Sequence, residues 1–148
     1  MTTDYIYDDW GNIATETRVI DGQTFVTQFD YDRAGNYTDI TYPDNTLVEY
    51  AYNTGGLLET VNLTIPGEST QTIVTDTDYA PNLQVSYRAY GNATESTYTY
   101  NPDELYRLEN IYTVNVPGQG GGGEIAMLSE EEIAKAFYAT AGGNGLVK

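Results

Sequence analysis

Two pairs of carboxylates are the residues whose types and spacing could support chemistry. Asp30 with Asp32, and Asp76 with Asp78, stand two positions apart, and a glycosidase uses two carboxyl groups, one to protonate the leaving group and one as nucleophile or base. Residues i and i+2 of a strand share one face, opposite the residue between them. Because aromatic residues such as Tyr31 alternate with the acids, we expect the acids to lie in solvent. The pattern predicts no catalytic residue and a chain that is not an enzyme.

Carboxylates and amides could also hold calcium, which prefers oxygen ligands. Such groups stand close together at Asp8-Asp9, at Asp44-Asn45 and at Asp76 with Asp78. None has the D-x-[DN]-x-[DN]-G spacing of a calcium-binding loop. The chain has no His and no Cys, so zinc sites, thiol nucleophiles, disulfides and His-dependent triads are excluded. We therefore expect no cofactor, with incidental calcium on the acidic surface as the alternative.

Charge narrows the classes of partner. The formal net charge is −16 over 148 residues, whereas a surface that binds nucleic acid or anionic lipid must be basic. No apolar run reaches the length of about 18 residues that crosses a bilayer. The first residues also lack the basic and apolar regions of a secretion signal. The composition predicts no nucleic-acid partner and no membrane insertion.

The elements that position these acids belong to an internal repeat. An aromatic-x-Tyr phrase, followed by Asp or Asn and a turn, recurs along the chain, with a weaker copy that keeps only its final Tyr at Tyr79. The final Tyr returns every 21 to 27 residues, at Tyr7, Tyr31, Tyr52, Tyr79 and Tyr100. A period of this length holds two short strands and two turns, and such units stack to bury a common face. We predict that these five Tyr are the stacking anchors, and that the turns depend on Gly11, Gly35 and Gly56.

Hydrophobic alternation predicts the strands of each unit. Residues 37–42 and 47–52 alternate on either side of a Pro-Asp-Asn turn. Asp21-Gly22 is the strongest hairpin signal, between strands at 15–20 and 24–29. The predicted fold is all-β: an antiparallel meander of hairpin repeats forming a curved sheet over residues 1–116. Open edges on such a sheet invite pairing with another chain.

The repeat stops near residue 116. Residues 117–124 are glycine-rich and are predicted to be a linker. Residues 125–148 are predicted to form one short amphipathic helix and a flexible tail, with Ser129 as N-cap and Glu132 completing a capping box.

The repeated phrase resembles the YD-repeat, or Rhs-repeat, family. The closest copies are Tyr5/Tyr7/Asp8/Gly11, Phe29/Tyr31/Asp32/Gly35 and Tyr50/Tyr52/Asn53/Gly56. The copies at Tyr79 and Tyr100 keep less of the phrase, and the resemblance covers residues 5–112. In that family the repeats form a spiralling β-sheet shell that encloses a toxic domain in bacterial polymorphic toxins and toxin complexes. Five repeats are too few to close such a shell, and the family's Asp-Pro-x-Gly self-cleavage motif is absent.

The resemblance implies a structural role in a β-sheet shell or surface protein, associated with toxin encapsulation or cell-surface interaction. It implies a bacterial protein that is secreted or on the cell surface, with an export signal outside this sequence. Expected partners are neighbouring repeats, other copies of the chain, an enclosed toxin domain or a surface glycan. Two alternatives stay open: a module that binds a glycan or a partner through its Tyr rows, and a fibre subunit that self-assembles through open sheet edges.

Overall fold

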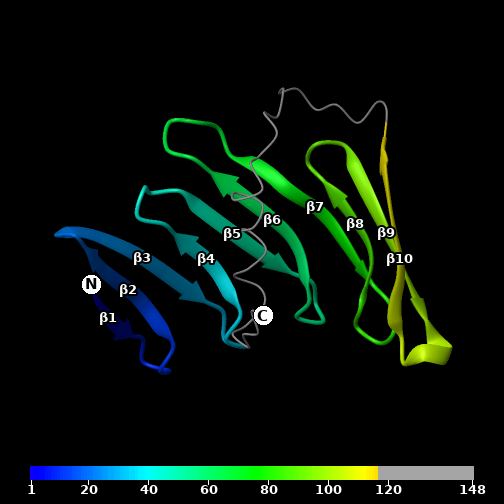
Figure 1. Cartoon of the computed structure of the whole chain (residues 1–148), viewed down its shortest axis with the longest axis horizontal. Coiled ribbons are helices and arrows are strands. Elements are labelled where there is room, and N and C mark those ends of the chain that lie inside the picture. The colour runs from blue at the N-terminus through cyan, green and yellow to red at the C-terminus, as the bar shows by residue number, and fades with distance from the viewer. Residues whose placement is uncertain (117–148) are drawn as a thin grey trace.

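The computed structural model describes residues 1–116 of the chain. They form one ten-stranded antiparallel sheet whose strands lie in sequence order, so every connection is a hairpin (Figure 1). The predicted meander is therefore confirmed. The strands are β1 (Thr2–Tyr7), β2 (Ile13–Ile20), β3 (Gln23–Tyr31), β4 (Tyr37–Thr41), β5 (Leu47–Tyr52), β6 (Leu58–Thr64), β7 (Gln71–Tyr79), β8 (Val85–Tyr90), β9 (Thr94–Asn101) and β10 (Arg107–Asn115).

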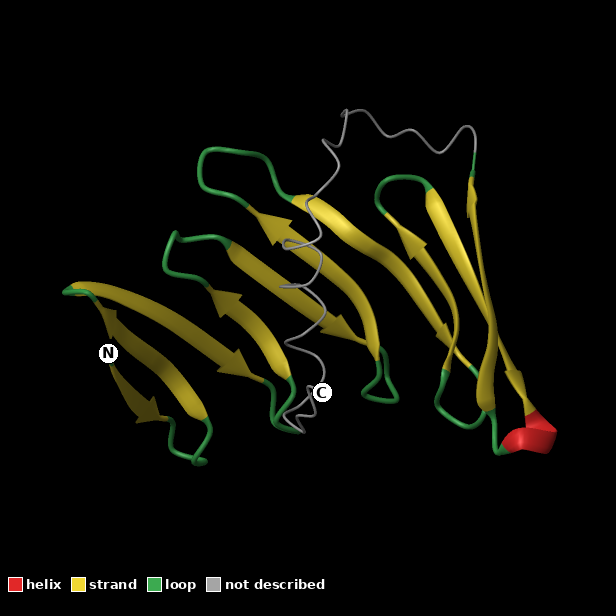
Figure 2. Cartoon of the chain, viewed as in Figure 1, coloured by secondary structure: helices red, strands yellow, loops and turns green. Residues whose placement is uncertain are grey.

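The strands pair into five repeat units, each made of an odd-numbered strand, a turn and the following even-numbered strand. We call the five turns inside the units the anchor turns. They all lie on one side of the sheet, at one end of the strands, and the turns between units lie on the other side, at the opposite strand ends (Figure 2). Asp21 and Gly22 both have positive φ, 51° and 80°, and they join β2 to β3 with Ile20 opposite Gln23. The hairpin predicted from these two residues is confirmed.

The buried residues are concentrated on one face of the central strands. In one row across the sheet Ile40 lies opposite Val48, and Val48 lies opposite Leu63. In a second row Tyr50 lies opposite Val61, and Val61 lies opposite Val74. The core consists of Ile40, Val48, Tyr50, Val61, Leu63, Ile73 and Val74. Alternation along the strands explains most of this placement, because every second residue of a strand points to the same face. Ile73 and Val74 are consecutive and both buried, at the point where the pairing of β6 with β7 shifts register.

The opposite face carries acids and Thr. Asp30 lies opposite Asp39, and Asp39 lies opposite Glu49, so three acidic residues stand in one row across β3, β4 and β5. Like charges directly opposite each other destabilise a strand pair slightly. This row keeps the face hydrated, while the apolar face holds the sheet together.

Gly91, between β8 and β9, lies close to the backbone of β7. Its N–H donates to the carbonyl of Ile73 at 3.1 Å, and a Cβ at Gly91 would overlap the carbonyl oxygen of Thr72. The pairing of β7 with β8 shifts by one residue between Val74 and Asp76. Gly91 is therefore needed for space rather than for a positive φ.

The predicted linker, residues 117–124, and the predicted helix within residues 125–148 lie outside the described residues. Within residues 1–116 the helical structure is one 3-10 turn, η1 (Pro102–Glu104), in the fifth anchor turn. No helix of this described part is long and apolar enough to span a membrane.

Candidate functional site

The anchor turns use a carboxylate as an acceptor for the turn backbone. Oδ1 of Asp32 accepts from the N–H groups of Ala34 and Asn36 at 2.8 and 2.9 Å, and Oδ2 accepts from Nδ2 of Asn36 at 3.0 Å. The first anchor turn repeats this with Asp8, whose Oδ1 accepts from Trp10 and Asn12 at 2.9 and 2.8 Å. The acid of the repeated phrase thus organises its own turn.

The same bonds lower the pKa of the turn carboxyls. For Asp8 and for Asp32 the largest cause is the side-chain hydrogen bond from the Asn four residues later, Asn12 and Asn36 respectively. Hydrogen bonds to the ionised form favour that form. A carboxylate held in this way lacks the raised pKa that a general acid needs at neutral pH.

The third turn replaces the acid with Asn53. Its Oδ1 accepts from the N–H of Gly55 at 2.9 Å and from that of Leu57 at 3.1 Å. In the backbone, Asn53 N–H donates to the carbonyl of Leu57 at 2.9 Å, as Asp32 does to Asn36. One acceptor oxygen is therefore sufficient to close the turn, which explains why Asn replaces Asp in this copy.

The predicted turn glycines share one backbone conformation. Gly11, Gly35 and Gly56 have φ of 86°, 85° and 74°, and a Cβ at any of them would meet nothing within 4 Å. These positions call for glycine because of the positive φ alone. In the fourth and fifth turns Leu83 and Leu105 take positive φ without glycine, at 67° and 58°.

The anchor tyrosines connect one unit to the unit before it. Four of the five donate their hydroxyl to a backbone carbonyl of the preceding unit, which we call the clasp. The clasps run from Tyr31 to Ile13 (2.9 Å), from Tyr52 to Tyr37 (2.8 Å), from Tyr79 to Leu58 (2.6 Å) and from Tyr100 to Val85 (2.7 Å).

The acceptor of each clasp occupies the same place in its unit. It is the first residue of an even-numbered strand and lies opposite the anchor of its own unit: Ile13 opposite Tyr7, Tyr37 opposite Tyr31, Leu58 opposite Tyr52 and Val85 opposite Tyr79. One unit therefore meets the next through a repeating contact between an anchor hydroxyl and a carbonyl. A neutral hydrogen bond of this type contributes about 0.5–1.5 kcal/mol net.

Three of the clasped tyrosines, Tyr31, Tyr52 and Tyr79, are partly withdrawn from water. Burial raises the pKa of Tyr52 to about 12, with the charge of Asp32 adding to the shift. Burial also raises the pKa of Tyr31 and of Tyr79. Ring contact is found at Tyr31, whose centroid lies 4.8 Å from that of Tyr37. At Tyr31 a directional hydrogen bond is therefore added to the packing of the aromatic rings.

Tyr7 differs from the other anchors, because in this structure no unit precedes it. It is 58% exposed and lies on β1, at the end of the sheet. The role of the five tyrosines and three glycines as repeat anchors stays a prediction, and the mutations described below test it.

The carboxylate pairs considered for catalysis do not converge. Both oxygens of Asp32 are engaged in its turn, while Asp30 stands exposed on the strand before it. Asp76 and Asp78 are exposed on either side of the buried Thr77. Among residues 1–116 no group of three or more carboxylates is placed to hold a metal ion.

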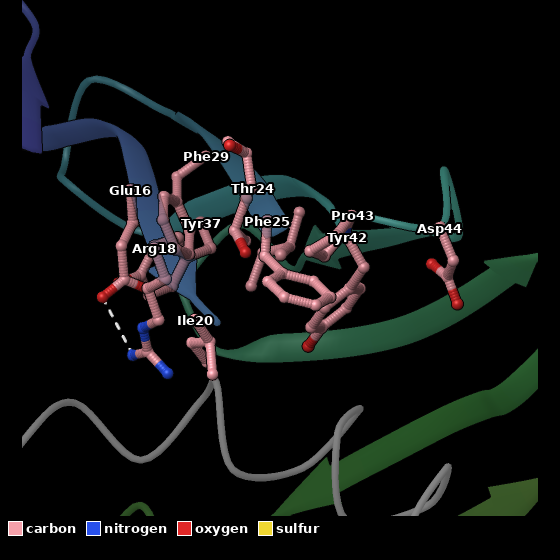
Figure 3. Close-up of a pocket in the computed structure, with 12 residues that line it drawn as sticks. Glu16, Arg18, Ile20, Thr24, Phe25, Phe29, Tyr37, Tyr42, Pro43 and Asp44 are labelled. Carbon is pink, nitrogen blue, oxygen red and sulfur yellow. Dashed lines mark hydrogen bonds and ion pairs between the residues drawn. The ribbon is translucent and has the colours of Figure 1, made fainter. Parts of the chain in front are cut away.

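A cavity of about 830 Å³ lies on the apolar face over β2–β4. Figure 3 shows the rings of Phe25 and Tyr42 at its centre. Arg18 and Glu16 form an ion pair of 2.9 Å at one side, and Asp44 lies at the other. The cavity combines aromatic surface with charged groups at its rim.

The RHS Repeat family model matches residues 7–47, which include the first two anchor turns and the first clasp. Residues 7–47 are thus similar to an RHS repeat. The resemblance predicted from the Tyr-x-Tyr-Asp phrases is therefore confirmed. No curated protein matches the chain.

Solved structures of toxin-complex proteins share the fold. The crystal structure of TcdB2-TccC3 aligns with a TM-score of 0.65 and 23% identity, over 72% of this chain and 6% of that one. TcdB2-TccC3-TEV aligns with a TM-score of 0.67 and 22% identity, over 75% and 6%. The Photorhabdus luminescens Tc holotoxin pore aligns with 0.63 and 23%, over 70% and 6%. The chain thus spans about 6% of the length of these proteins.

The sequence analysis missed the acceptors of the clasps and the packing role of Gly91. The acceptors act through backbone carbonyls, so their side chains vary freely among Ile, Tyr, Leu and Val. A spacing signal exists nevertheless, because each acceptor stands six residues after an anchor, at 13, 37, 58 and 85. Nothing in the sequence near Gly91 indicates that a neighbouring strand lies against its Cα.

Proposed function

We propose that this chain is a structural segment of a β-sheet shell, in which RHS-type units stand side by side as a wall. The observation that supports this most strongly is the repeated clasp. Each unit from the second to the fifth holds the unit before it through the same hydroxyl-to-carbonyl contact. Because the same contact joins each pair of neighbouring units, further units can be added to the sheet through the same contact.

The two faces support the same proposal. Aliphatic and Tyr side chains fill the face that carries the rows across β4–β7, while Asp30, Asp39 and Glu49 stand on the other. A sheet with one apolar and one charged face separates two environments. That separation is what a wall around a cargo, or a wall at a cell surface, requires.

We further propose that the wall belongs to a bacterial protein that is secreted or displayed at the cell surface, and that it encloses a toxin domain or contacts a surface partner. The RHS repeat at residues 7–47 and the fold shared with TcdB2-TccC3 support this. Neighbouring units are its nearest partners. The chemistry is physical rather than catalytic, because the acids of the repeats are used to build turns.

The test is to purify the native polypeptide that contains this sequence and to image it by electron microscopy. A hollow particle is expected, together with recovery from the culture medium or outer surface and protection of the enclosed segment from protease. A Tyr50→Ala variant, which removes a core ring, should lose that protection, whereas the exposed-face variant Asp76→Asn should keep it. A compact cytoplasmic particle without an internal space would contradict the proposal.

Glycan binding is a second candidate, and the cavity over β2–β4 is the observation that favours it. Phe25 is exposed at the centre of this cavity and Tyr42 stands beside it. Aromatic rings stack on the apolar faces of sugars, and the charged groups of Arg18 and Asp44 could bind hydroxyls.

A titration of the chain with a panel of neutral oligosaccharides tests this candidate. Saturable binding that is lost in Phe25→Ala and retained in Trp10→Ala, an exposed aromatic outside the cavity, would support it. Absence of saturable binding to any member of the panel would leave the cavity as part of the wall's surface.

A further inference from the structure

We propose that the edge strand β1 docks on the edge strand β10 of a second copy of this chain, through the same clasp that joins the units within one copy. The inference rests on the proposed function, because it treats each unit as a stackable element of a wall. In this contact the hydroxyl of Tyr7 from one copy donates to the carbonyl of Leu108 from the other.

The two ends of the sheet carry the two halves of one clasp. Tyr7 is the one anchor without a clasp among residues 1–116. Leu108 lies opposite Tyr100, as the acceptors Ile13 and Tyr37 lie opposite Tyr7 and Tyr31. It differs from them in being the second residue of β10 and eight residues after its anchor, because the fifth anchor turn is longer. The fifth unit thus presents an acceptor, and the first unit presents the matching donor.

Strand direction agrees with this pairing. Every odd-numbered strand runs toward the anchor turns and every even-numbered strand runs away from them, because the ten strands form an antiparallel meander. A β1 strand placed beside β10 therefore continues the antiparallel order, and the anchor turns of both copies then lie on the same side of the combined sheet. β1 and β10 lie at opposite ends of the sheet, so they cannot pair with each other within one copy (Figure 1).

The junctions within the chain fix the register. At the β2–β3 junction Thr15, two residues after the acceptor Ile13, lies opposite Gln28, three residues before the anchor Tyr31 of the next unit. The β4–β5 and β8–β9 junctions have the same register, with Asp39 opposite Glu49 and Tyr87 opposite Thr97. The β6–β7 junction departs from this register through its bulge between Val61 and Asn62.

The same register between two copies gives specific pairs. Asn110 lies opposite Asp4 of the second copy, and Ile111 lies opposite Thr3. Ile111 and Thr3 lie on the face of the anchor tyrosines, because Ile111 lies opposite Tyr98, two residues before the anchor Tyr100, and Thr3 is four residues before the anchor Tyr7. Asn110 and Asp4 lie together on the other face. The register sets an uncharged amide, not a second acid, against Asp4.

Exposed apolar residues gather at these two ends. The first hairpin exposes Tyr5, Ile6, Tyr7 and Trp10, and the last exposes Leu105, Tyr106, Leu108, Ile111 and Tyr112. The central strands β4–β7 expose no large apolar side chain. A head-to-tail contact covers both sets at once. It is heterologous, so it leads to an open filament or a ring rather than a closed dimer.

The chain has no cysteine, so single-cysteine variants of the full chain give a clean test. Four variants are made: Thr3→Cys, Asp4→Cys, Asn110→Cys and Ile111→Cys. Under mild oxidation, mixing Thr3→Cys with Ile111→Cys should give a disulfide-linked pair of chains, and so should mixing Asp4→Cys with Asn110→Cys. Cross-strand Cβ atoms stand about 4.5–5.5 Å apart, close enough to be linked after a small adjustment.

The mismatched mixtures are the controls. Thr3→Cys with Asn110→Cys, and Asp4→Cys with Ile111→Cys, place their thiols on opposite faces and should cross-link at least tenfold less. Equal cross-linking in all four mixtures, or none in the matched ones, would overturn the proposal. A single chain cannot link its own ends, since β1 and β10 are separated by nine strand spacings of about 4.8 Å along the sheet.

Sedimentation of the full chain tests the clasp itself. The mean mass should rise with protein concentration and with salt, which screens the repulsion between copies of net charge −16. Tyr7→Phe should weaken association by roughly two- to tenfold, and Tyr87→Phe, away from both edges, should not. A monomer at all concentrations would overturn this inference, whereas a shell formed by the native polypeptide would still support the proposed function.

Discussion

The phrases Tyr5-Ile6-Tyr7 and Tyr50-Ala51-Tyr52 have the same alternation, and each ends in a five-residue turn closed by an Asx side chain. Their surroundings differ. Tyr50 is 5% exposed and belongs to the core, whereas Tyr5 is 47% exposed. Local sequence therefore gives the two copies one conformation and leaves their burial undetermined.

The difference comes from the neighbouring units. Tyr50 lies on β5, between β4 and β6, and the hydroxyl of Tyr52 is clasped to Tyr37. Tyr5 lies on β1 and has a neighbouring strand on one side, β2. A repeat unit becomes part of a core only when a second unit stands against it, because a single hairpin cannot bury its own apolar face.

The largest expected effect separates these two copies directly. Tyr50→Ala should lower the free energy of unfolding by about 3–5 kcal/mol, as does the loss of other buried aromatic rings. Tyr5→Ala should lower it by less than about 1 kcal/mol, because half of that ring is already in solvent. Urea unfolding followed by circular dichroism measures both. Equal losses would show that burial does not distinguish the copies.

Removal of the anchor hydroxyl should give a smaller effect. Tyr52→Phe leaves the ring in place but deprives the Tyr37 carbonyl of its donor, so the expected cost is about 1–3 kcal/mol. Tyr7→Phe is the matched control, because the Tyr7 hydroxyl forms no clasp among residues 1–116, and it should leave the unfolding midpoint of the dilute monomer unchanged. If both variants had the same unfolding midpoint as the wild type, the clasp would make no contribution to stability.

Replacing a turn glycine should lower stability by similar amounts in the first unit, at the end of the sheet, and in the second unit, inside it. Gly35→Ala and Gly11→Ala both force a side chain into a positive-φ conformation, at a cost of about 1–2 kcal/mol each. Space is available at both positions, so no clash adds to that cost. Thermal unfolding of the two variants should show similar decreases in Tm. A much larger loss at Gly35 would mean that its neighbours constrain it too.

The smallest effect concerns alkaline pH. The pKa of Tyr52 is raised to about 12 in the folded chain, above the value of about 10 for an unfolded tyrosine. The folded state therefore keeps this proton when the unfolded state releases it, so its contribution is complete below pH 10 and is lost as the pH rises through 12. Stability measured from pH 8 to pH 12 should fall less steeply in Tyr52→Phe than in the wild type.

Much of the fold could be predicted because its signals are local. The alternation in residues 47–52 gave β5, and Asp21-Gly22 gave the β2–β3 turn. The clasps were not predicted, because their acceptors are backbone carbonyls that any side chain can accompany. The need for glycine at position 91 was not predicted either, because it arises from the carbonyl of Thr72 on another strand.

The sequence by itself determined the strands, the anchor turns, the phase of the repeat and the chemical contrast between the two faces, since each depends on residues a few positions apart. Only the tertiary structure decided which tyrosines are buried, where each hydroxyl finds its carbonyl, and which edges are left with an unmatched donor or acceptor. Those features depend on the position of a unit among its neighbours, and the repeated phrase is the same wherever it stands.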